Sequence, residues 1–315
     1  MLTSPVPWIL FLLGTIIGSF LNVVIYRTPA ILLADWYNDN DESTDDESEE
    51  TLEIPEAFGP RLWFTLRYLF SDILYSFTYL FKDFWVESYH VLKGLSFPGS
   101  RCGQCQRDIA WYDNLPVLSW FLLRGRCRHC HTSYSFRYPL IEFLTGVLFV
   151  YTYSLHPQIA DLIWWIPLVS LLWAIFWIDL DTQFVFNVMT YPSIFLGILY
   201  NGSKVNLGWA LLGGLIAWCF FEGVALLSVL LLKKQGMGGG DVKLAVLIGI
   251  WLGPEQLLVA LAIAFVTGSI AGISLMLKQG ESKPFPFGPF LVVGMLLSMA
   301  VGEQLWAWYI GESVL

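Results

Sequence analysis

Charged residues are scarce in this sequence. Only 14% of its 315 residues are Asp, Glu, Lys or Arg, whereas 56% are hydrophobic and 17% are aromatic. Soluble domains carry about 25% charged residues, so the composition excludes an ordinary soluble protein. It predicts an all-α protein that crosses a membrane many times.

Long apolar stretches account for most of the chain. A membrane-spanning helix needs roughly 20 apolar residues at about 1.5 Å per residue, and most of the stretches approach that length. One of them, 242–253, is too short, so we expect it to cross partly or to join 256–277 as a broken helix. The eight stretches are 8–26, 138–156, 160–178, 184–200, 207–232, 242–253, 256–277 and 287–309.

Basic residues are almost missing from one side of the predicted membrane protein. The first stretch has neither a basic start nor a small-residue cleavage site, so we interpret it as a spanning helix and not as a signal peptide. If the chain starts outside and crosses the membrane about eight times, sixteen of its seventeen Lys and Arg residues lie on one side of the membrane. Only Lys204 then lies on the opposite side. The positive-inside rule assigns the basic side, including the loop 27–137, to the cytoplasm.

The net charge of −9 comes mostly from one segment, residues 35–56. Its acidic part, 39–50, has too little apolar surface to fold and is predicted to be disordered. Aromatic and leucine residues then crowd 61–95 between charged ones, which favours one or two interfacial helices. We expect three parts: a first transmembrane helix (1–26), a cytoplasmic loop (27–137) and a transmembrane core (138–315). No nucleic-acid partner is expected.

Cysteine is also rare, and four of the five cysteines form two Cys-x2-Cys pairs. They are Cys102, Cys105, Cys127 and Cys130, and paired knuckles of this kind bring four thiolates into tetrahedral geometry around Zn2+. We therefore predict a structural zinc site in a zinc-ribbon-like loop. Two short disulfides or a metal-free redox pair are the alternatives, and the reducing cytosol disfavours disulfides. Next to the last cysteine, His131 is predicted to be a surface residue. The fifth cysteine, Cys219, is predicted to be a packing residue.

The sequence lacks the motifs of nucleotide binding. The glycine-rich run GMGGGDVK at 236–243 has neither the ending nor the preceding strand of a phosphate-binding loop, and βαβ units for a dinucleotide fold are missing. Glycines without Cβ atoms permit a second backbone to approach closely. We predict that Gly238, Gly239 and Gly240 form a substrate loop. A flexible loop that caps a helix at Asp241 is a compatible interpretation.

Two carboxylates mark the predicted chemistry, because they stand where apolar stretches break on the cytoplasmic side. Asp241 follows the glycines, and either Asp179 or Asp181 ends the stretch 160–178 as its partner. Positions i and i+2 point apart on a helix, so only one should face Asp241. Two neighbouring carboxyl groups of low solvation are a candidate acid and base pair.

Four other polar residues lie within the predicted helices. Asn22 and Glu142 are near the cytoplasmic ends, where a structural hydrogen bond and a role in substrate binding are both open. Glu222 and Glu303 lie deeper, and we expect them to form interhelical bonds.

Several motifs together resemble the prepilin peptidases, or type IV leader peptidases, which are membrane aspartyl proteases of the GxGD kind. The similar segments are GSFLNVVIYR at 18–27, LPVLSW at 115–120, LRGRC at 123–127, RYPLIE at 137–142, GGGD at 238–241 and PFGPF at 286–290. The resemblance identifies Asp179 and Asp241 as the catalytic pair, with Asn187 eight residues after the first. The family usually has proline before that later residue, and this sequence has Phe186.

The resemblance implies a bifunctional enzyme. It would cut the leader of prepilins or pseudopilins after a glycine at the cytoplasmic face of a bacterial inner membrane, with its N-terminus in the periplasm. It would then methylate the new amino terminus with S-adenosylmethionine. The partners implied are these substrates and the lipid bilayer.

Two other functions fit part of the sequence. A transporter or scaffold with a zinc-binding loop would use the aspartates as ion ligands at broken helices, but matching sequence halves are not seen. A protease that cuts inside substrate helices would place its aspartates at mid-membrane, whereas these lie at the predicted cytoplasmic boundary.

Overall fold

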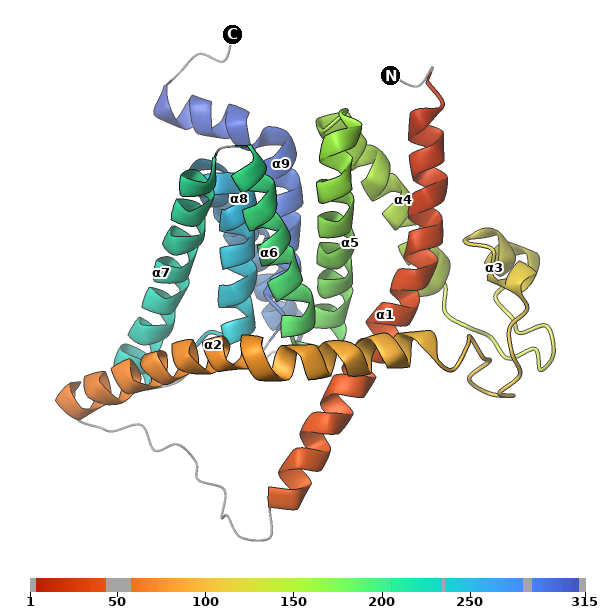
Figure 1. The fold of residues 1–315 in the computed structure, drawn as a ribbon, viewed down its shortest axis with the longest axis horizontal. Helices are drawn as coiled ribbons and strands as arrows, with labels where there is room; N and C mark the ends of the chain where they lie inside the picture. The colour runs from red at the N-terminus through yellow and green to blue at the C-terminus, as the bar shows by residue number, and fades with distance from the viewer. Residues whose placement is uncertain (1–3, 44–57, 205, 234–235, 280–284, 312–315) are drawn as a thin grey trace. The chain divides into compact units, whose positions relative to one another are not determined.

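The computed structural model describes residues 4–43, 58–204, 206–233, 236–279 and 285–311. These residues are mostly helical (Figure 1), and β pairing among them is limited to two isolated bridges. The predicted all-α class is confirmed. The elements are α1 (Val6–Ser43), α2 (Phe58–Ser96), the 3-10 helix η1 (Trp111–Asn114), α3 (Leu118–Leu122), α4 (Arg137–Leu155), α5 (Ile159–Thr182), α6 (Asn187–Ser203), α7 (Leu207–Leu232), α8 (Gly239–Gln279) and α9 (Gly288–Ile310).

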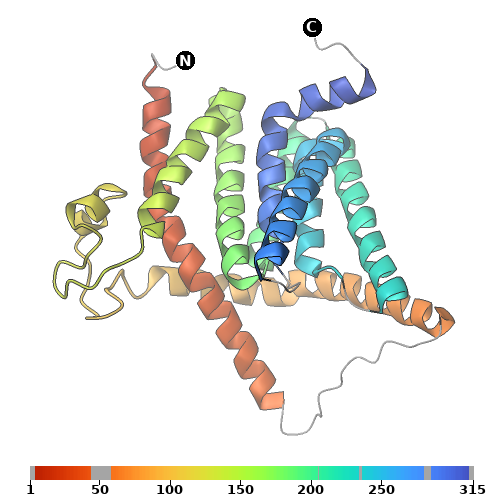
Figure 2. The same cartoon turned by 180° about the vertical axis from the view of Figure 1, so that it is seen from behind.

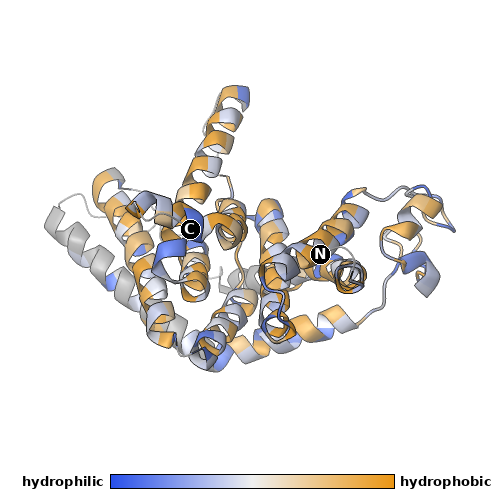
Figure 3. Ribbon diagram, turned by 90° about the horizontal axis from the view of Figure 1, so that it is seen from above, coloured by the Kyte–Doolittle hydropathy of each residue, from blue (hydrophilic) through white to orange (hydrophobic). Residues whose placement is uncertain are grey.

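Six helices in the described part of the chain are long and apolar enough to cross a membrane, namely α1, α4, α5, α7, α8 and α9. The protein is a multi-pass membrane protein. α6 has 17 residues and is shorter than these spans. Large apolar side chains on the outer faces of the helices, such as those of Ile16, Leu215 and Ile270, are exposed. They form the surface that lipid tails cover, and apolar residues dominate the helices in Figure 3.

The two predicted stretches 242–253 and 256–277 are the halves of α8. Gly253 has φ 75° and ψ 175°, which interrupts the helix, and Pro254 follows it. Glycine adopts this backbone conformation without steric cost, and proline is well suited to start the next helical segment. The expected broken helix is therefore present, and the count of eight stretches becomes a smaller number of longer helices.

One expectation for the N-terminal half needs correction. α1 continues past residue 26 to Ser43, so residues 39–43 of the segment predicted to be disordered are helical; residues 44–50 lie outside the described ones. Continuing from an existing helix adds one hydrogen bond per residue, whereas nucleation is costly, so a helix can extend into an acidic sequence. Residues 61–95 form part of one helix, α2, which is within the expectation of one or two helices.

The chain divides into two compact units. The first contains Met1–Leu33 and Tyr89–Ala174, and the second contains Ala34–Ser88 and Ile175–Leu315. In the first unit, glycines let α1 cross α4 at short distance (Figure 1). A Cβ added to Gly14 would lie 2.7 Å from the Cα of Gly146, and one added to Gly18 would lie 2.7 Å from the Cα of Glu142. Small residues at such crossings are typical of membrane helices.

In the second unit, α6, α7, α8 and α9 lie side by side in both views (Figures 1 and 2). Gly213 of α7 and Gly249 of α8 face each other so closely that a Cβ on either would collide with the carbonyl of the other. Buried apolar side chains, including Leu247 and Val292, fill the space between the helices. This packing fixes the beginnings of α8 and α9, which carry the candidate site together with the end of α5.

Candidate active site and cysteine cluster

Asp179 lies near the end of α5 and is almost fully buried, with 3% of its surface exposed. The backbone N–H of Gly288, at the start of α9, donates a hydrogen bond to its carboxylate. One carboxylate oxygen, Oδ2, is buried and has no assigned hydrogen-bond partner within the described ranges. Buried polar atoms are normally paired, so this oxygen marks a candidate functional site.

Gly288 is necessary for this arrangement. A Cβ at this position would lie 2.6 Å from Asp179 Oδ2 and 3.2 Å from its Cγ. Any side chain larger than hydrogen would push the carboxyl group away. The sequence motif PFGPF therefore acts through its glycine, which lets the start of α9 touch the aspartate.

Asp241 lies in the first turn of α8, and its backbone N–H donates to the carbonyl of Gly238 at 3.1 Å. The carboxyl groups of Asp179 and Asp241 are close enough to interact electrostatically. Asp181, the alternative partner, is exposed. The structure thus brings together Asp179 and Asp241 from helices that are far apart in the sequence.

The three glycines before Asp241 differ in their surroundings. Gly238 and Gly239 are exposed, and an added Cβ on Gly239 would have no atom within 4 Å. In contrast, a Cβ on Gly240 would lie 2.9 Å from Cβ of Val185. Gly240 therefore allows close packing against the α5–α6 connection, while the two exposed glycines leave open backbone beside the acid.

Lys243, which was not predicted as a site residue, lies two residues after Asp241 on α8. Its Nζ donates to Asn187 Oδ1 at 3.1 Å and lies 5.8 Å from the ring centre of Tyr191. This contact ties α8 to the start of α6, beside the aspartates. A lysine within an apolar helix was the available signal, because such a charge is costly unless it has partners.

The four cysteines of the first unit form a cluster whose sulfur atoms all lie within 4.8 Å of one another. The sulfur atoms of Cys102 and Cys130 are 3.6 Å apart. A tetrahedral zinc site with Zn–S bonds of about 2.3 Å requires sulfur atoms about 3.8 Å apart. The cluster fits Zn2+ in number, type and spacing of ligands.

Each Cys-x2-Cys pair sits in the same kind of turn. The backbone N–H of Gln106 donates to the carbonyl of Cys102 at 2.9 Å, and that of His131 donates to the carbonyl of Cys127 at 3.0 Å. Gln106 and His131 both have φ 56°. The two halves therefore repeat one local fold, and the exposed His131 confirms that this residue lies at the surface.

Without a metal the cysteines of the cluster differ in pKa, because hydrogen bonds lower the pKa of Cys102, whereas desolvation and the neighbouring cysteines raise that of Cys105 to about 11. Bonds with the side chain and backbone of Thr132 lower the pKa of the Cys130 thiol to about 6. A thiolate is the form that binds zinc.

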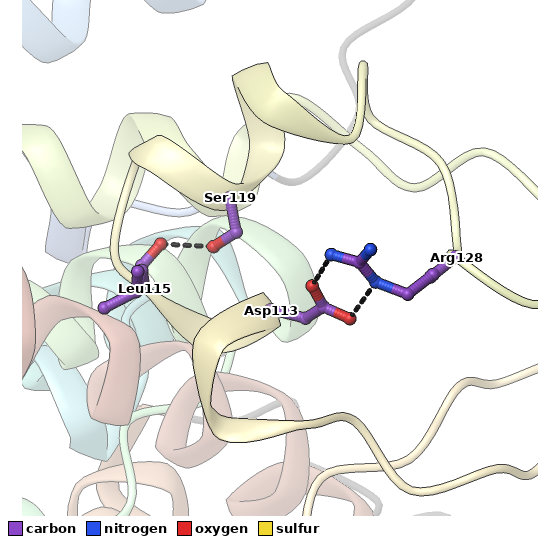
Figure 4. Close-up of polar contacts among 4 residues, drawn as sticks. All are labelled: Asp113, Leu115, Ser119 and Arg128. Carbon is purple, nitrogen blue, oxygen red and sulfur yellow. Dashed lines mark hydrogen bonds and ion pairs between the residues drawn. The ribbon is translucent and has the colours of Figure 1, made fainter.

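An ion pair connects the cluster to η1 (Figure 4). Arg128 donates from Nε and Nη2 to the two carboxylate oxygens of Asp113, at 2.8 and 2.5 Å. Hydrogen bonds and the charge of Arg128 hold the pKa of Asp113 below its usual range. In the same segment Ser119 donates to the carbonyl of Leu115. The two parallel hydrogen bonds from Arg128 fix the orientation of the Asp113 carboxylate as well as its distance from the arginine.

The remaining predicted residues have mixed outcomes. Asn22 donates a hydrogen bond to the carbonyl of Tyr138 at 3.2 Å. Glu303 on α9 accepts a hydrogen bond from Gln256 on α8 at 3.3 Å, which is the interhelical bond expected for it. The expectation for Glu222 stays a prediction. The assignment of Cys219 to packing is wrong, because its side chain is exposed on the outer face of α7. An apolar helix gives no sequence signal that separates its lipid-facing side from its packed side.

Known proteins are similar in sequence to this chain over nearly its whole length. Residues 12–156 match the bacterial peptidase A24 N-terminal domain, and residues 166–273 match the type IV leader peptidase family. A prepilin leader peptidase/N-methyltransferase of Aeromonas hydrophila is 32% identical, covering 98% of this chain and 97% of its own. Proteins of the same name from Neisseria gonorrhoeae (32%, covering 93% and 90%) and Legionella pneumophila (30%, covering 97% and 96%) are also similar. No solved structure matches.

Proposed function

Because this chain belongs to the type IV leader peptidase family, we propose that it removes the leader peptide of type IV prepilins or pseudopilins and then methylates the new amino terminus. Its relatives at about 30% identity over nearly their whole length carry both activities in their name. The enzyme is thus an aspartic endopeptidase and an N-methyltransferase.

Asp179 and Asp241 are the proposed catalytic residues of cleavage. The observation that supports this role is the buried, partly unpaired carboxyl of Asp179 in electrostatic contact with Asp241. Two carboxyl groups this close and this poorly solvated share one proton. One takes a proton from a water molecule, whose oxygen attacks the peptide carbonyl, while the other donates its proton to the carbonyl oxygen.

The exposed glycines Gly238 and Gly239 are the proposed substrate loop. A peptide in extended conformation can approach their backbone without meeting a side chain. Gly240 belongs to this loop as the residue that keeps it against Val185. The scissile bond, after a glycine, would then lie beside Asp241.

The cysteine cluster is the proposed structural zinc site, with Cys102, Cys105, Cys127 and Cys130 as its ligands. Zinc would hold the two turns together as a cross-link within the first unit. The methyl donor proposed for the second reaction is S-adenosylmethionine, whose sulfonium group supplies an activated methyl.

The proposed location is a bacterial inner membrane, with the N-terminus in the periplasm. The excess of Lys and Arg in the loop 27–137 and around Lys233 supports this orientation. The aspartates and the cysteine cluster would both face the cytoplasm. The division into a first helix (1–26), a cytoplasmic loop (27–137) and a protease core (138–315) stays a proposal.

A reconstituted assay tests the proposed function. Purified full-length protein in lipid vesicles is incubated with a prepilin, with and without S-adenosylmethionine, and the products are identified by mass spectrometry. We expect a leaderless product in both cases and a mass increase of one methyl group only with the donor. An uncleaved prepilin would overturn the proposal.

A further inference from the structure

The first unit contains a cavity of about 510 Å3, separate from the two aspartates. Its lining comes from α1, from α4 and from the loop between them that carries the cysteine cluster. Small-molecule sites in proteins have volumes of about 300–1,000 Å3 and combine apolar walls with a few polar groups. This cavity has the size of such a site, and the proposed cleavage reaction does not use it.

One carboxylate, that of Glu142 on α4, lies in this cavity and is held by three donors. The backbone N–H of Val117 donates to its Oε2 at 2.6 Å. The side chains of Ser19 and Asn22, both on α1, also hydrogen-bond to it. The close crossing of α1 and α4 at Gly18 makes these contacts possible, because any Cβ there would meet the Cα of Glu142.

The donor from Val117 requires an unfavourable backbone conformation. Val117 has φ 61° and ψ −50°, and the N–H of Leu118 donates to the carbonyl of Pro116 at 2.6 Å. This is a γ-turn with positive φ, a rare and strained turn, and a β-branched residue is especially disfavoured in it. Backbone strain of this kind persists mainly at functional sites. Here it aims one N–H at the carboxylate of Glu142.

The arginines that line the cavity have other partners among the described residues. Arg27 donates to the carbonyls of Gly94 and Gly99, at 2.9 and 3.3 Å. Arg128 pairs with Asp113, and Arg101 pairs with Asp108 at 2.7 Å. Arg107 contacts His129. Within the described ranges Glu142 has hydrogen-bond donors but no cation, so the site is suited to a small cation such as an ammonium group.

We propose that this cavity is the methyl-transfer site and that Glu142 binds the free α-ammonium group of the cleaved substrate and accepts a proton from it. The inference rests on the proposed function and adds the location and the amine-binding residue. The chemistry balances: the ammonium loses one proton to Glu142, and the amine nitrogen then bonds to the donor's methyl carbon. The carbon–sulfur bond breaks with its electrons on sulfur, which leaves a thioether and a secondary ammonium.

The test uses Glu142→Gln in the full-length protein. Glutamine keeps an oxygen that accepts the Val117 N–H, but it has no charge and takes no proton. A synthetic peptide that already has the mature, free amino terminus is supplied with S-adenosylmethionine, so methylation is measured without cleavage. We expect methylation to fall at least about 100-fold, as for loss of a general base, while prepilin cleavage stays within about twofold of the original rate on the same reasoning.

A binding measurement separates a charge effect from a structural one. Affinity is measured without a methyl donor for the free-amine peptide and for the same peptide acetylated at its amino terminus. Glu142→Gln should weaken binding of the free amine about tenfold, because a charge-assisted hydrogen bond is lost, and leave the acetylated peptide unchanged. Glu303→Gln, which changes a carboxylate of α9 in the second unit, is the matched control and should alter neither measurement.

Each outcome decides between the proposals. If the original protein methylates the peptide and Glu142→Gln does so equally fast, the inference is overturned and the proposed function stands. Equal weakening for both peptides would likewise reduce Glu142 to a structural residue and overturn the inference. If the original protein leaves the peptide unmethylated, the methyltransferase half of the proposed function fails, and the inference fails with it.

Discussion

The cysteine cluster and the aspartate site are built in opposite ways. The four cysteines lie within one loop, with Cys102 and Cys130 only 28 residues apart, and local turns aim their sulfur atoms. Asp179 and Asp241 lie 62 residues apart, on two helices, and Gly288 of a third helix completes their surroundings. The first site therefore depends on local sequence, and the second depends on helix packing. Damage to one should therefore spare the other.

The largest expected effect comes from the aspartates. Asp179→Asn or Asp241→Asn should lower prepilin cleavage at least about 1,000-fold, since loss of an acid or base costs about 100- to 10,000-fold. The double variant should be little worse than either single one, because residues that act as a unit are not additive. Rates are measured by mass spectrometry of the released leader.

Methylation of a peptide that is already cleaved sharpens the same comparison. It should stay within about twofold of the original rate in both aspartate variants, because no methyl-transfer step uses these residues. A parallel loss of cleavage and methylation would show that the two sites are not separate.

Gly288→Ala should have the next largest effect, a loss of cleavage of about 100-fold. A Cβ would lie 2.6 Å from Asp179 Oδ2, and a displacement of about 1 Å in a catalytic group costs about that factor. Gly202→Ala is the control, because nothing lies within 4 Å of its added Cβ. Equal cleavage by both variants would argue against the contact between α9 and Asp179.

Cys102→Ser should act on the other region. We expect loss of bound zinc, measured by metal analysis per chain. Methylation should decrease about tenfold, which is the smaller end of the range of activity loss seen when a metal site is disturbed. Cleavage should change less than about threefold, since the two sites lie in different units. Cys219→Ser, which removes the exposed thiol of α7, should keep zinc and both activities. Full zinc content in Cys102→Ser would contradict the ligand assignment.

The smallest effect is expected for Asp113→Asn. Arg128 lowers the pKa of Asp113 in the folded protein, so the pair stabilises the fold above the ordinary carboxyl pKa of about 3.9. This stabilisation is lost as the pH falls through the lowered folded-state value. The variant should melt about 1–3 °C below the original protein at pH 7, because Arg128 is half-exposed and solvent weakens its attraction to Asp113.

The difference in melting temperature should shrink as the pH falls below about 4. Calorimetry at several pH values provides the check. A difference that grows in acid would have the wrong sign for this ion pair.

The sequence predicted local features well and long-range ones incompletely. The cysteine cluster followed from the spacing of the cysteines, and the break in α8 followed from the short length of the stretch 242–253, because both depend on neighbouring residues. The residue pattern alone left Asp179 and Asp181 open and only the family resemblance favoured Asp179, since the choice depends on which face of α5 is buried. The contact of Lys243 with Asn187 was missed for the same reason. Exposure of Cys219 could not be read from a helix that is apolar on every side.

The most direct test of the central claim measures the proximity of the two acids. Asp179→Cys and Asp241→Cys are combined in a Cys219→Ser background and treated with a thiol cross-linker about one methylene long, and linked peptides are identified by mass spectrometry. We expect an intramolecular link between positions 179 and 241, and none for Asp181→Cys with Asp241→Cys, because Asp181 is exposed and positions i and i+2 point apart on a helix. A link through position 181 but not 179 would contradict the central claim.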